Sequence, residues 1–156
     1  MMESYFRIVQ PHWAATAMDG EGARRFGGRW NLPGSPAIYL AESRALAALE
    51  ILVHAPREAL LLDWVLIRVE IPSGWIENAE LLDLPDDWHT RPSSQNAQSF
   101  GTRWLRAGVK PALRLPSVIV PEESTLLLNP LHPKVRSLKT GGPVTFRFDS
   151  RLAASP

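Results

Sequence analysis

The stretch Asp63–Ile71 constrains the fold most, because its side chains alternate in character along the chain. One set of alternate positions holds Trp64, Leu66, Arg68 and Glu70, and the other holds Val65, Ile67, Val69 and Ile71. Successive side chains of a β-strand point to opposite faces of a sheet, so the second set makes one face wholly apolar. The chain must therefore build a sheet and cover at least one face of it with other elements.

The rest of the chain predicts short strands joined by turns. We expect strands at Tyr5–Gln10, Gly28–Asn31, Ala37–Leu40, Leu115–Pro121, Thr125–Asn129 and Val144–Phe148. Small, polar and glycine residues predict a long loop over residues 12–28, and a turn follows at Leu32–Pro36. Gly74–Leu84 is expected to be a strand end or an irregular segment, and the tail Arg151–Pro156 is expected to fray.

Two segments predict helices. Ser43 is a suitable N-cap for a helix that runs to His54, where Ala55–Pro56 stops it. Ser93–Ala107 predicts a second helix, with Gly108 behind it as a stop. Because strands and helices do not alternate regularly, the order predicts an α+β fold: one compact domain over residues 1–156 with a single mixed sheet.

Composition excludes several classes of protein. A chain of 156 residues with 45% apolar residues and a net charge of +1 is typical of a globular domain, and no basic run favours a nucleic-acid partner. No apolar stretch of membrane-spanning length occurs, and Met1–Gln10 lacks the apolar core of a signal peptide, so we expect a cytoplasmic protein without a membrane partner. There is no cysteine, and the four histidines lack ligand spacing, so we expect no metal.

A carboxylate interrupts the first predicted helix. Ala45–Val53 reads ALAALEILV, and Glu50 is its only charged residue. Glu50 falls on the same helical stripe as Leu46 and Leu49, a face suited to burial. An ionised carboxylate there needs a partner or a wet cleft. Two interpretations stay open: a structural ion pair with Arg7 or Arg68, and a functional carboxylate.

Glycines mark a second unusual segment. Half of the ten glycines lie between residues 20 and 34, and Gly27-Gly28 directly precedes Arg29. Adjacent glycines let backbone N–H groups approach an anion, and a guanidinium offers a planar donor fork for phosphate oxygens. The alternative is a tight turn with an exposed arginine. The spacing differs from that of the dinucleotide and nucleoside-triphosphate glycine motifs.

Polar residues also punctuate the apolar C-terminal strands. Ser117 stands inside Pro116–Pro121, and Asn129 begins a proline-rich turn that ends at Pro133. A buried serine or asparagine needs hydrogen-bond partners, so both residues are candidates for substrate positioning or for turn chemistry. Ser117 lacks a G-x-S-x-G elbow, which argues against a serine-hydrolase nucleophile.

Together these motifs resemble the RES-domain family, the toxins of RES–Xre toxin–antitoxin modules. The segments that carry the resemblance occur in order along the chain: Phe6–Ile8, Gly27–Gly34, Ala37–Tyr39, Leu49–His54, Pro116–Pro121 and Leu127–Pro133. The family is named after an arginine, a glutamate and a serine, which fall here on Arg29, Glu50 and Ser117.

The resemblance implies a fold similar to that of ADP-ribosyltransferases and an enzyme that depletes NAD by cleaving the nicotinamide–ribose bond. Phosphorolysis is the expected reaction, with NAD as substrate and inorganic phosphate as co-substrate; transfer of ADP-ribose to a protein acceptor is the alternative. Arg29, Glu50 and Ser117 are the implied catalytic residues, and Arg7, Arg29, Tyr39 and Asn129 are implied to bind NAD. The implied partners are an Xre-type helix-turn-helix antitoxin and a second copy of the chain.

Two other classes of function compete with this interpretation. A nucleic-acid-directed module would use the fourteen arginines and six tryptophans as a stacking surface, but a net charge of +1 gives little attraction for a polyanion. A non-enzymatic interaction domain would be favoured if Glu50 were locked in an internal ion pair away from any cleft.

Overall fold

Seven strands form one mixed sheet in the order β4-β5-β6-β2-β1-β3-β7, in a computed structural model that describes residues 1–80 and 83–154. The strands are β1 Met2–Val9, β2 Ile38–Ala41, β3 Trp64–Pro72, β4 Ile76–Asn78, β5 Ala112–Pro116, β6 Ser124–Leu128 and β7 Val144–Phe146. Only β4 and β5 pair in parallel; every other neighbouring pair is antiparallel. The predicted α+β fold with a mixed sheet is therefore confirmed.

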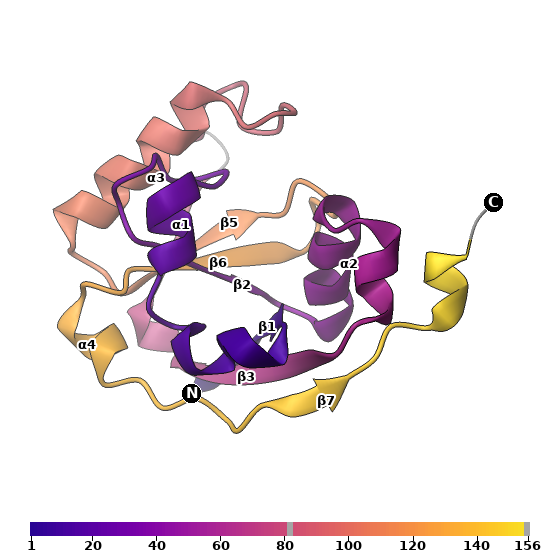
Figure 1. Cartoon of the computed structure of the whole chain (residues 1–156). Helices are drawn as coiled ribbons and strands as arrows, with labels where there is room; N and C mark the ends of the chain where they lie inside the picture. Colours follow the sequence, from indigo (N-terminus) through magenta and orange to yellow (C-terminus); the bar gives the residue numbers. More distant parts are fainter. Residues whose placement is uncertain (81–82, 155–156) are drawn as a thin grey trace.

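Within the described residues, four α-helices and four 3₁₀ helices accompany the strands. The α-helices are α1 Glu21–Phe26, α2 Arg44–His54, α3 Gln95–Ala107 and α4 Pro133–Arg136. The 3₁₀ helices are η1 Pro11–Thr16, η2 Arg57–Leu61, η3 Ser73–Trp75 and η5 Ser150–Ala153. In Figure 1, α1 and α3 lie together toward one end of the molecule and α2 lies toward the other, with β2 running between them.

Both predicted long helices are confirmed, and their caps explain where they begin and end. The Ser43 hydroxyl accepts the Leu46 N–H at 3.0 Å, and α2 ends at His54 before the extended Ala55. In α3 the cap is Ser94, whose hydroxyl accepts the Ala97 N–H at 3.0 Å. Gly108 ends this helix in the left-handed conformation, with φ +63°.

The prediction of a loop over residues 12–28 is wrong. The 3₁₀ helix η1 begins at Pro11, and α1 occupies residues 21–26 between two left-handed glycines, Gly20 and Gly27, both with φ +73°. A six-residue helix spans fewer than two turns, so hydrophobic periodicity cannot reveal it. The glycines marked the helix ends rather than a loop.

Two strand predictions also need correction. Gly28–Asn31 is a tight turn closed by a bridge between its end residues, in which the Gly28 N–H donates to the Asn31 carbonyl at 3.0 Å. Leu115–Pro121 is shifted, since β5 covers Ala112–Pro116 and a turn follows. An apolar sequence alone does not distinguish a strand from a buried turn.

The two remaining predictions concern irregular segments. Gly74–Leu84 contains the end of η3 and the short strand β4, and its residues 81–82 lie outside the described part of the chain. The tail expected to fray at Arg151–Pro156 begins inside η5, and its residues 155–156 are likewise outside the described part.

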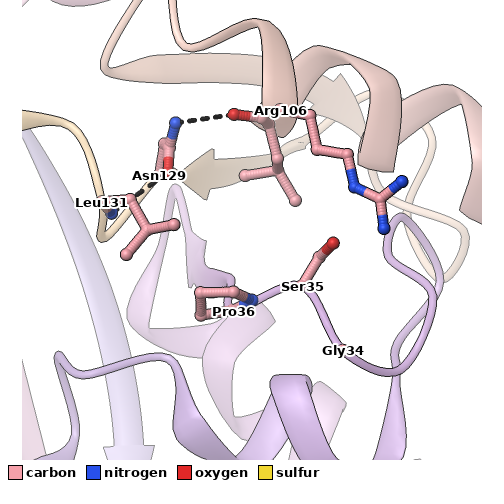
Figure 2. A pocket seen from close by; sticks show the side chains of 7 residues that line it. Gly34, Ser35, Pro36, Arg106, Asn129 and Leu131 are labelled. Carbon is pink, nitrogen blue, oxygen red and sulfur yellow. Dashed lines mark hydrogen bonds between the residues drawn. The ribbon is translucent and has the colours of Figure 1, made fainter.

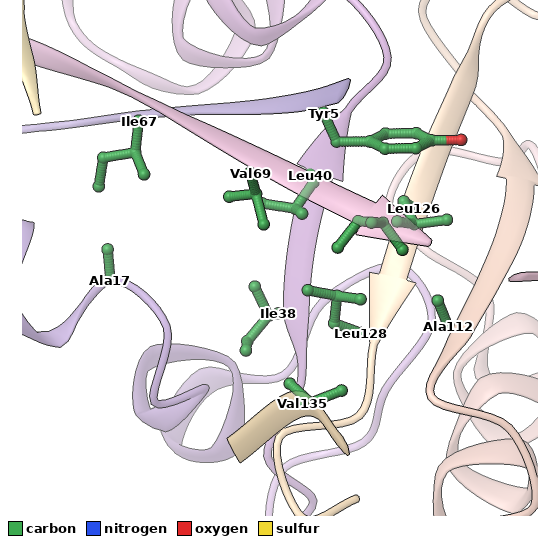
Figure 3. Close-up of a cluster of buried hydrophobic side chains, with 11 residues drawn as sticks. Tyr5, Ala17, Ile38, Leu40, Ile67, Val69, Ala112, Leu126, Leu128 and Val135 are labelled. Atoms are coloured by element: carbon green, nitrogen blue, oxygen red, sulfur yellow. The ribbon is translucent and has the colours of Figure 1, made fainter. Parts of the chain in front are cut away.

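The sheet carries one core cluster on one face and two on the other. Figure 3 shows the first cluster, formed by Tyr5, Ala17, Ile38, Leu40, Ile67, Val69, Ile71, Ala112, Leu126, Leu128 and Val135. It buries the apolar face predicted for β3. Directly paired residues of antiparallel strands share a face, so Ala41 and Tyr39, two residues apart on β2, point to the opposite face. There Ala41 belongs to a cluster under α2, and Tyr39 packs against a separate cluster under α3.

The pairing between β1 and β2 is short. These strands pair only at Phe6 and Ala41, whereas β1 and β3 pair over eight positions and β2 and β6 over four. The next residue of β1 is Arg7, which is paired with Ile67 of β3 but not with β2, and which therefore shares the sheet face of the first cluster.

Candidate active site

Glu50 lies on the inner face of α2 without a partner. Leu46 and Ala47, one turn earlier on the same face, are buried, and Glu50 itself is half-buried. Among the described residues no hydrogen bond or ion pair engages its carboxylate. Burial raises the pKa of Glu50, while the nearby charges of His54 and Arg29 act to lower it.

Neither arginine suggested as a structural partner pairs with Glu50. The Arg68 guanidinium donates to Glu70 at 2.5 Å and to the Ser4 hydroxyl at 2.9 Å. The nearby charge that acts on the pKa of Arg7 is that of Asp19, not that of Glu50. Within the described ranges, the interpretation of Glu50 as one half of an internal ion pair is therefore wrong.

Arg29 is anchored by a loop far away in sequence. Its Nη1 donates to the carbonyl oxygens of Trp88 at 2.9 Å and Thr90 at 2.8 Å. Burial lowers the pKa of Arg29, and so does the charge of Arg91, while Glu50 opposes them. Arg29 and Glu50 each influence the pKa of the other through their charges, and the anchored Nη1 leaves the other guanidinium nitrogens able to bind a substrate.

Tyr39 supports the turn that carries Arg29. Its hydroxyl donates to Asn31 Oδ1 at 2.5 Å and accepts the Trp30 N–H at 3.0 Å. Burial raises the pKa of Tyr39, which keeps the phenol neutral and able to donate. A Cβ on Gly28 would lie 2.7 Å from the Tyr39 hydroxyl, so this glycine allows the tyrosine to approach the turn.

Arg7 is a second predicted site arginine whose guanidinium N–H groups have no acceptor among the described residues. It is half-buried on β1, directly after the single pairing of β1 with β2. Burial lowers the pKa of Arg7, and Asp19 partly offsets this through its charge. In the part of the chain that the structure describes, the Arg7 guanidinium makes no hydrogen bond or ion pair, a state that an anionic ligand would relieve.

Ser117 begins the turn between β5 and β6. Its buried hydroxyl oxygen accepts the N–H groups of Ile119 at 3.0 Å and Val120 at 3.2 Å. Ile119 and Val120 pack against the cluster under α2, the helix that carries Glu50. The hydroxyl proton has no acceptor within the described residues, so Ser117 can both shape this turn and donate a hydrogen bond.

Asn129 lies in a different environment, at the end of β6. Its Nδ2 donates to the Leu105 carbonyl at 2.9 Å, and its Oδ1 accepts the Leu131 N–H at 3.1 Å. Figure 2 shows the pocket it lines, a cavity of about 190 Å³ bounded by Gly34, Ser35, Pro36, Leu105, Arg106, Asn129 and Leu131. Neither Glu50 nor Arg29 lines this pocket.

Several residues of the site carry no recognisable signal in the sequence. Asn31 is fully buried and binds both Tyr39 and three backbone carbonyls, and the loop around Trp88 anchors Arg29 through main-chain atoms. Main-chain contacts do not depend on residue type, so sequence patterns cannot predict them. His54 could have been found, since it stands four residues after Glu50 on the same helix.

The described residues offer neither a metal site nor a helix that could span a membrane. Within residues 1–80 and 83–154, no group of three or more histidine, aspartate or glutamate side chains is placed to hold a metal ion. None of the helices described here has both the length and the apolar character needed to span a bilayer.

Fold and site together define an α+β protein in which a backbone-anchored arginine and a half-buried carboxylate, unpaired among the described residues, interact through their charges. The RES domain model matches residues 4–149, and the chain belongs to this family. A protein named Toxin Res from Yersinia enterocolitica is 39% identical over 148 residues, covering 94% of this chain and 97% of that protein. The Prs ADP-ribosylating toxin from a Sphingobium species is 37% identical over 157 residues, covering 97% and 98%.

A mycobacterial protein matches in both sequence and structure. NAD(+) phosphorylase MbcT from Mycobacterium tuberculosis is 50% identical over 50 residues, which cover 31% of this chain and 26% of that protein. The crystal structure of the MbcT–MbcA toxin–antitoxin complex contains a chain with a TM-score of 0.78 and 22% identity, covering 98% of this chain and 87% of that one. This likeness shows that the fold is shared.

Proposed function

We propose that this protein is the toxin of a toxin–antitoxin module and that it depletes NAD by phosphorolysis, acting as one RES domain over residues 1–156. The family membership and the toxins among its relatives support the module. The NAD(+) phosphorylase activity in the name of MbcT supports the reaction. The feature of this chain that carries the proposal is Glu50, a half-buried carboxylate with no partner among the described residues, near Arg29.

The chemistry fits a single carboxylate. The bond between C1′ of the ribose and the nicotinamide nitrogen breaks, and its electron pair neutralises the cationic nicotinamide as it leaves. The ribose then has oxocarbenium character, which a nearby carboxylate stabilises electrostatically. An oxygen of inorganic phosphate forms the new bond to C1′ and yields ADP-ribose 1″-phosphate. Phosphate is already anionic at neutral pH, so the reaction needs no second carboxylate to deprotonate the nucleophile.

The other site residues would hold the substrate. Arg29, anchored through Nη1, and Arg7, with free donors, are suited to phosphate oxygens. The ring of Tyr39 would support the nicotinamide or the sugar while its hydroxyl holds the turn. Ser117 would donate a hydrogen bond from the turn beside α2. Asn129 lines a separate pocket and its amide binds Leu105 and Leu131, so it would act on NAD only by supporting the end of β6.

The direct test is incubation of the purified chain with NAD in buffers with and without phosphate, with products identified by mass spectrometry. We expect ADP-ribose 1″-phosphate and free nicotinamide in phosphate buffer, and a much lower rate of NAD loss without it. Equal rates in both buffers, with free ADP-ribose as the product, would replace phosphorolysis by hydrolysis.

Variants test the site assignment. Glu50→Ala and Arg29→Ala are expected to fold and to lose NAD consumption, because they remove the stabilising carboxylate and the phosphate donor. Glu58→Ala and Arg25→Ala are matched controls at exposed positions outside the site, and both should keep the parental rate. If Glu50→Ala or Arg29→Ala consumed NAD at the parental rate, this site assignment would be wrong.

ADP-ribosyl transfer to a protein is the second candidate activity. It is favoured by one observation, the 37% identity to an ADP-ribosylating toxin over nearly the whole of both chains. The same carboxylate would stabilise the same oxocarbenium-like ribose, with a protein side chain in place of phosphate as the nucleophile. NAD labelled in its adenosine part distinguishes the two, because transfer leaves the label on a polypeptide and phosphorolysis leaves it on a small molecule.

A toxin of this kind requires a partner that holds it inactive. We propose a helix-turn-helix antitoxin of the Xre type, encoded in a neighbouring reading frame and located with the toxin in the cytoplasm. The structural match to a chain of a toxin–antitoxin complex supports an antitoxin. Co-purification with that neighbour and loss of NAD consumption in the complex would test it. Light scattering of the free chain would test the proposed homodimer.

A further inference from the structure

The loop that anchors Arg29 is itself firmly held. The Trp88 N–H donates to the Pro85 carbonyl at 3.0 Å, and the Thr90 hydroxyl donates to the carbonyl oxygens of Asp87 at 3.1 Å and Pro92 at 3.2 Å. The indole of Trp88 stacks on buried Trp30, with ring centroids 6.2 Å apart and an interplanar angle of 17°. This loop therefore offers a defined backbone rather than a mobile flap.

Arg91 extends from this loop beside Arg29. It directly follows Thr90, whose carbonyl oxygen accepts Arg29 Nη1 at 2.8 Å, so the backbone places the two arginines next to each other. Consistent with this, the charge of Arg91 lowers the pKa of Arg29. Arg91 is exposed, and its side chain makes no hydrogen bond or ion pair among the described residues.

Nearby acidic groups do not neutralise this pair. Asp87, in the same loop, accepts hydrogen bonds from Ser94 at 3.0 Å and Asn96 at 3.1 Å, which hold it at the start of α3. Glu50 approaches Arg29 without forming an ion pair. Two positive charges therefore act on each other where the backbone of the loop meets Arg29, and like charges repel unless an anion lies between them.

We propose that Arg91 and Arg29 form a phosphoryl clamp, in which the anchored Arg29 and the exposed Arg91 bind oxygens of the same phosphoryl anion. The planar guanidinium forks match phosphate geometry, and two of them together neutralise a dianion. The anion is either the pyrophosphate of NAD or the incoming inorganic phosphate, and this role in turnover rests on the proposed function. Arg91 lies outside the segments that carry the family resemblance.

Kinetics of Arg91→Ala separate the two sources of the anion. Loss of one charge-assisted hydrogen bond should raise a KM by roughly 10- to 100-fold. A rise confined to the KM for NAD assigns the clamp to the pyrophosphate, and a rise confined to the KM for phosphate assigns it to the nucleophile. Arg91→Lys should recover part of the loss, since it restores the charge without the fork. Unchanged values of KM for both substrates would overturn the clamp.

A binding measurement tests the clamp without turnover. Inorganic pyrophosphate, and in a separate series inorganic phosphate, should raise the Tm of the unmodified chain, and Arg91→Ala should lose most of that rise. Arg103→Ala is the matched control, because Arg103 is exposed on the side of α3 away from its buried residues. Absence of stabilisation by both anions, or equal stabilisation of Arg91→Ala, would refute the clamp. If the anions bind as expected but NAD is not consumed, the proposed function fails and the clamp stands.

Discussion

Tyr39→Phe tests whether the hydroxyl of this tyrosine organises the site. The substitution keeps the aromatic ring and removes only the oxygen that joins Asn31 Oδ1, at 2.5 Å, to the Trp30 N–H, at 3.0 Å. Both partners belong to residues that are at most 1% exposed. Water therefore cannot replace the hydroxyl without a rearrangement of the turn.

The expected loss of stability follows from these two partners. Leaving a buried donor or acceptor unsatisfied costs about 1–3 kcal/mol, so two such groups predict a loss of about 2–6 kcal/mol. In a domain of this size each kcal/mol lowers the Tm by roughly 2–4 °C, so the Tm should fall by at least roughly 4 °C. Because the turn also carries Arg29, the KM for NAD should rise with it.

Urea unfolding followed by tryptophan fluorescence measures this loss directly. Tyr5→Phe is the matched control, because Tyr5 is the only other tyrosine and its hydroxyl contacts the partly exposed side chains of Arg114 and Glu3. We expect a clearly smaller loss there. If Tyr39→Phe cost no more than Tyr5→Phe and left the KM unchanged, the hydroxyl would not be what holds the turn.

Three further predictions concern single residues. Glu50→Gln should be more stable relative to the parent at pH 8 than at pH 4. Burial raises the pKa of Glu50 above its usual 4.5, so the stability that the parent gains from the protonated carboxyl is lost as pH rises through that raised pKa. The Tm of both proteins at pH 4 and pH 8 measures this, and a reversed difference would contradict it. Gly101→Ala should destabilise the protein by about 3 kcal/mol or more, because the new Cβ would lie 1.8 Å from the Trp30 carbonyl oxygen. Gly22→Ala is the control and should stabilise, since alanine favours a helix interior and a Cβ there meets open space. Equal effects of the two substitutions in thermal unfolding would refute the clash. Ser117→Ala should cost about 1–3 kcal/mol in urea unfolding by leaving backbone N–H groups without an acceptor, and a neutral effect would show that the turn stands without the hydroxyl.

Local signals predicted the parts of the fold whose stability is local. Ser43 and Gly108 marked a helix start and a helix end, because caps satisfy backbone groups within a few residues. The same reasoning failed for residues 12–28, where η1 and α1 form, α1 between two left-handed glycines, because helices this short depend on packing rather than on a local pattern. It also failed for Gly28–Asn31, whose shape depends on the hydroxyl of Tyr39 and on α3.

The candidate site also has one part that the sequence predicted and one part that depends on contacts between distant segments. Glu50 was recognisable from the sequence because it is a charged residue on a helical stripe that is otherwise apolar. That this carboxylate has neither Arg7 nor Arg68 as its partner could not be known, since ion pairing depends on distances between elements far apart in the chain.

The sequence by itself determined the two long helices, the apolar face of β3 and the identity of the charged residues that need an explanation. The tertiary structure decided which of those charges meet. It anchors Arg29 on the backbone of a loop some sixty residues away and limits the pairing of β1 with β2 to one position. The physical reason is that main-chain contacts and strand register are set by the packing of the whole sheet, whereas burial patterns and caps are set by neighbours along the chain.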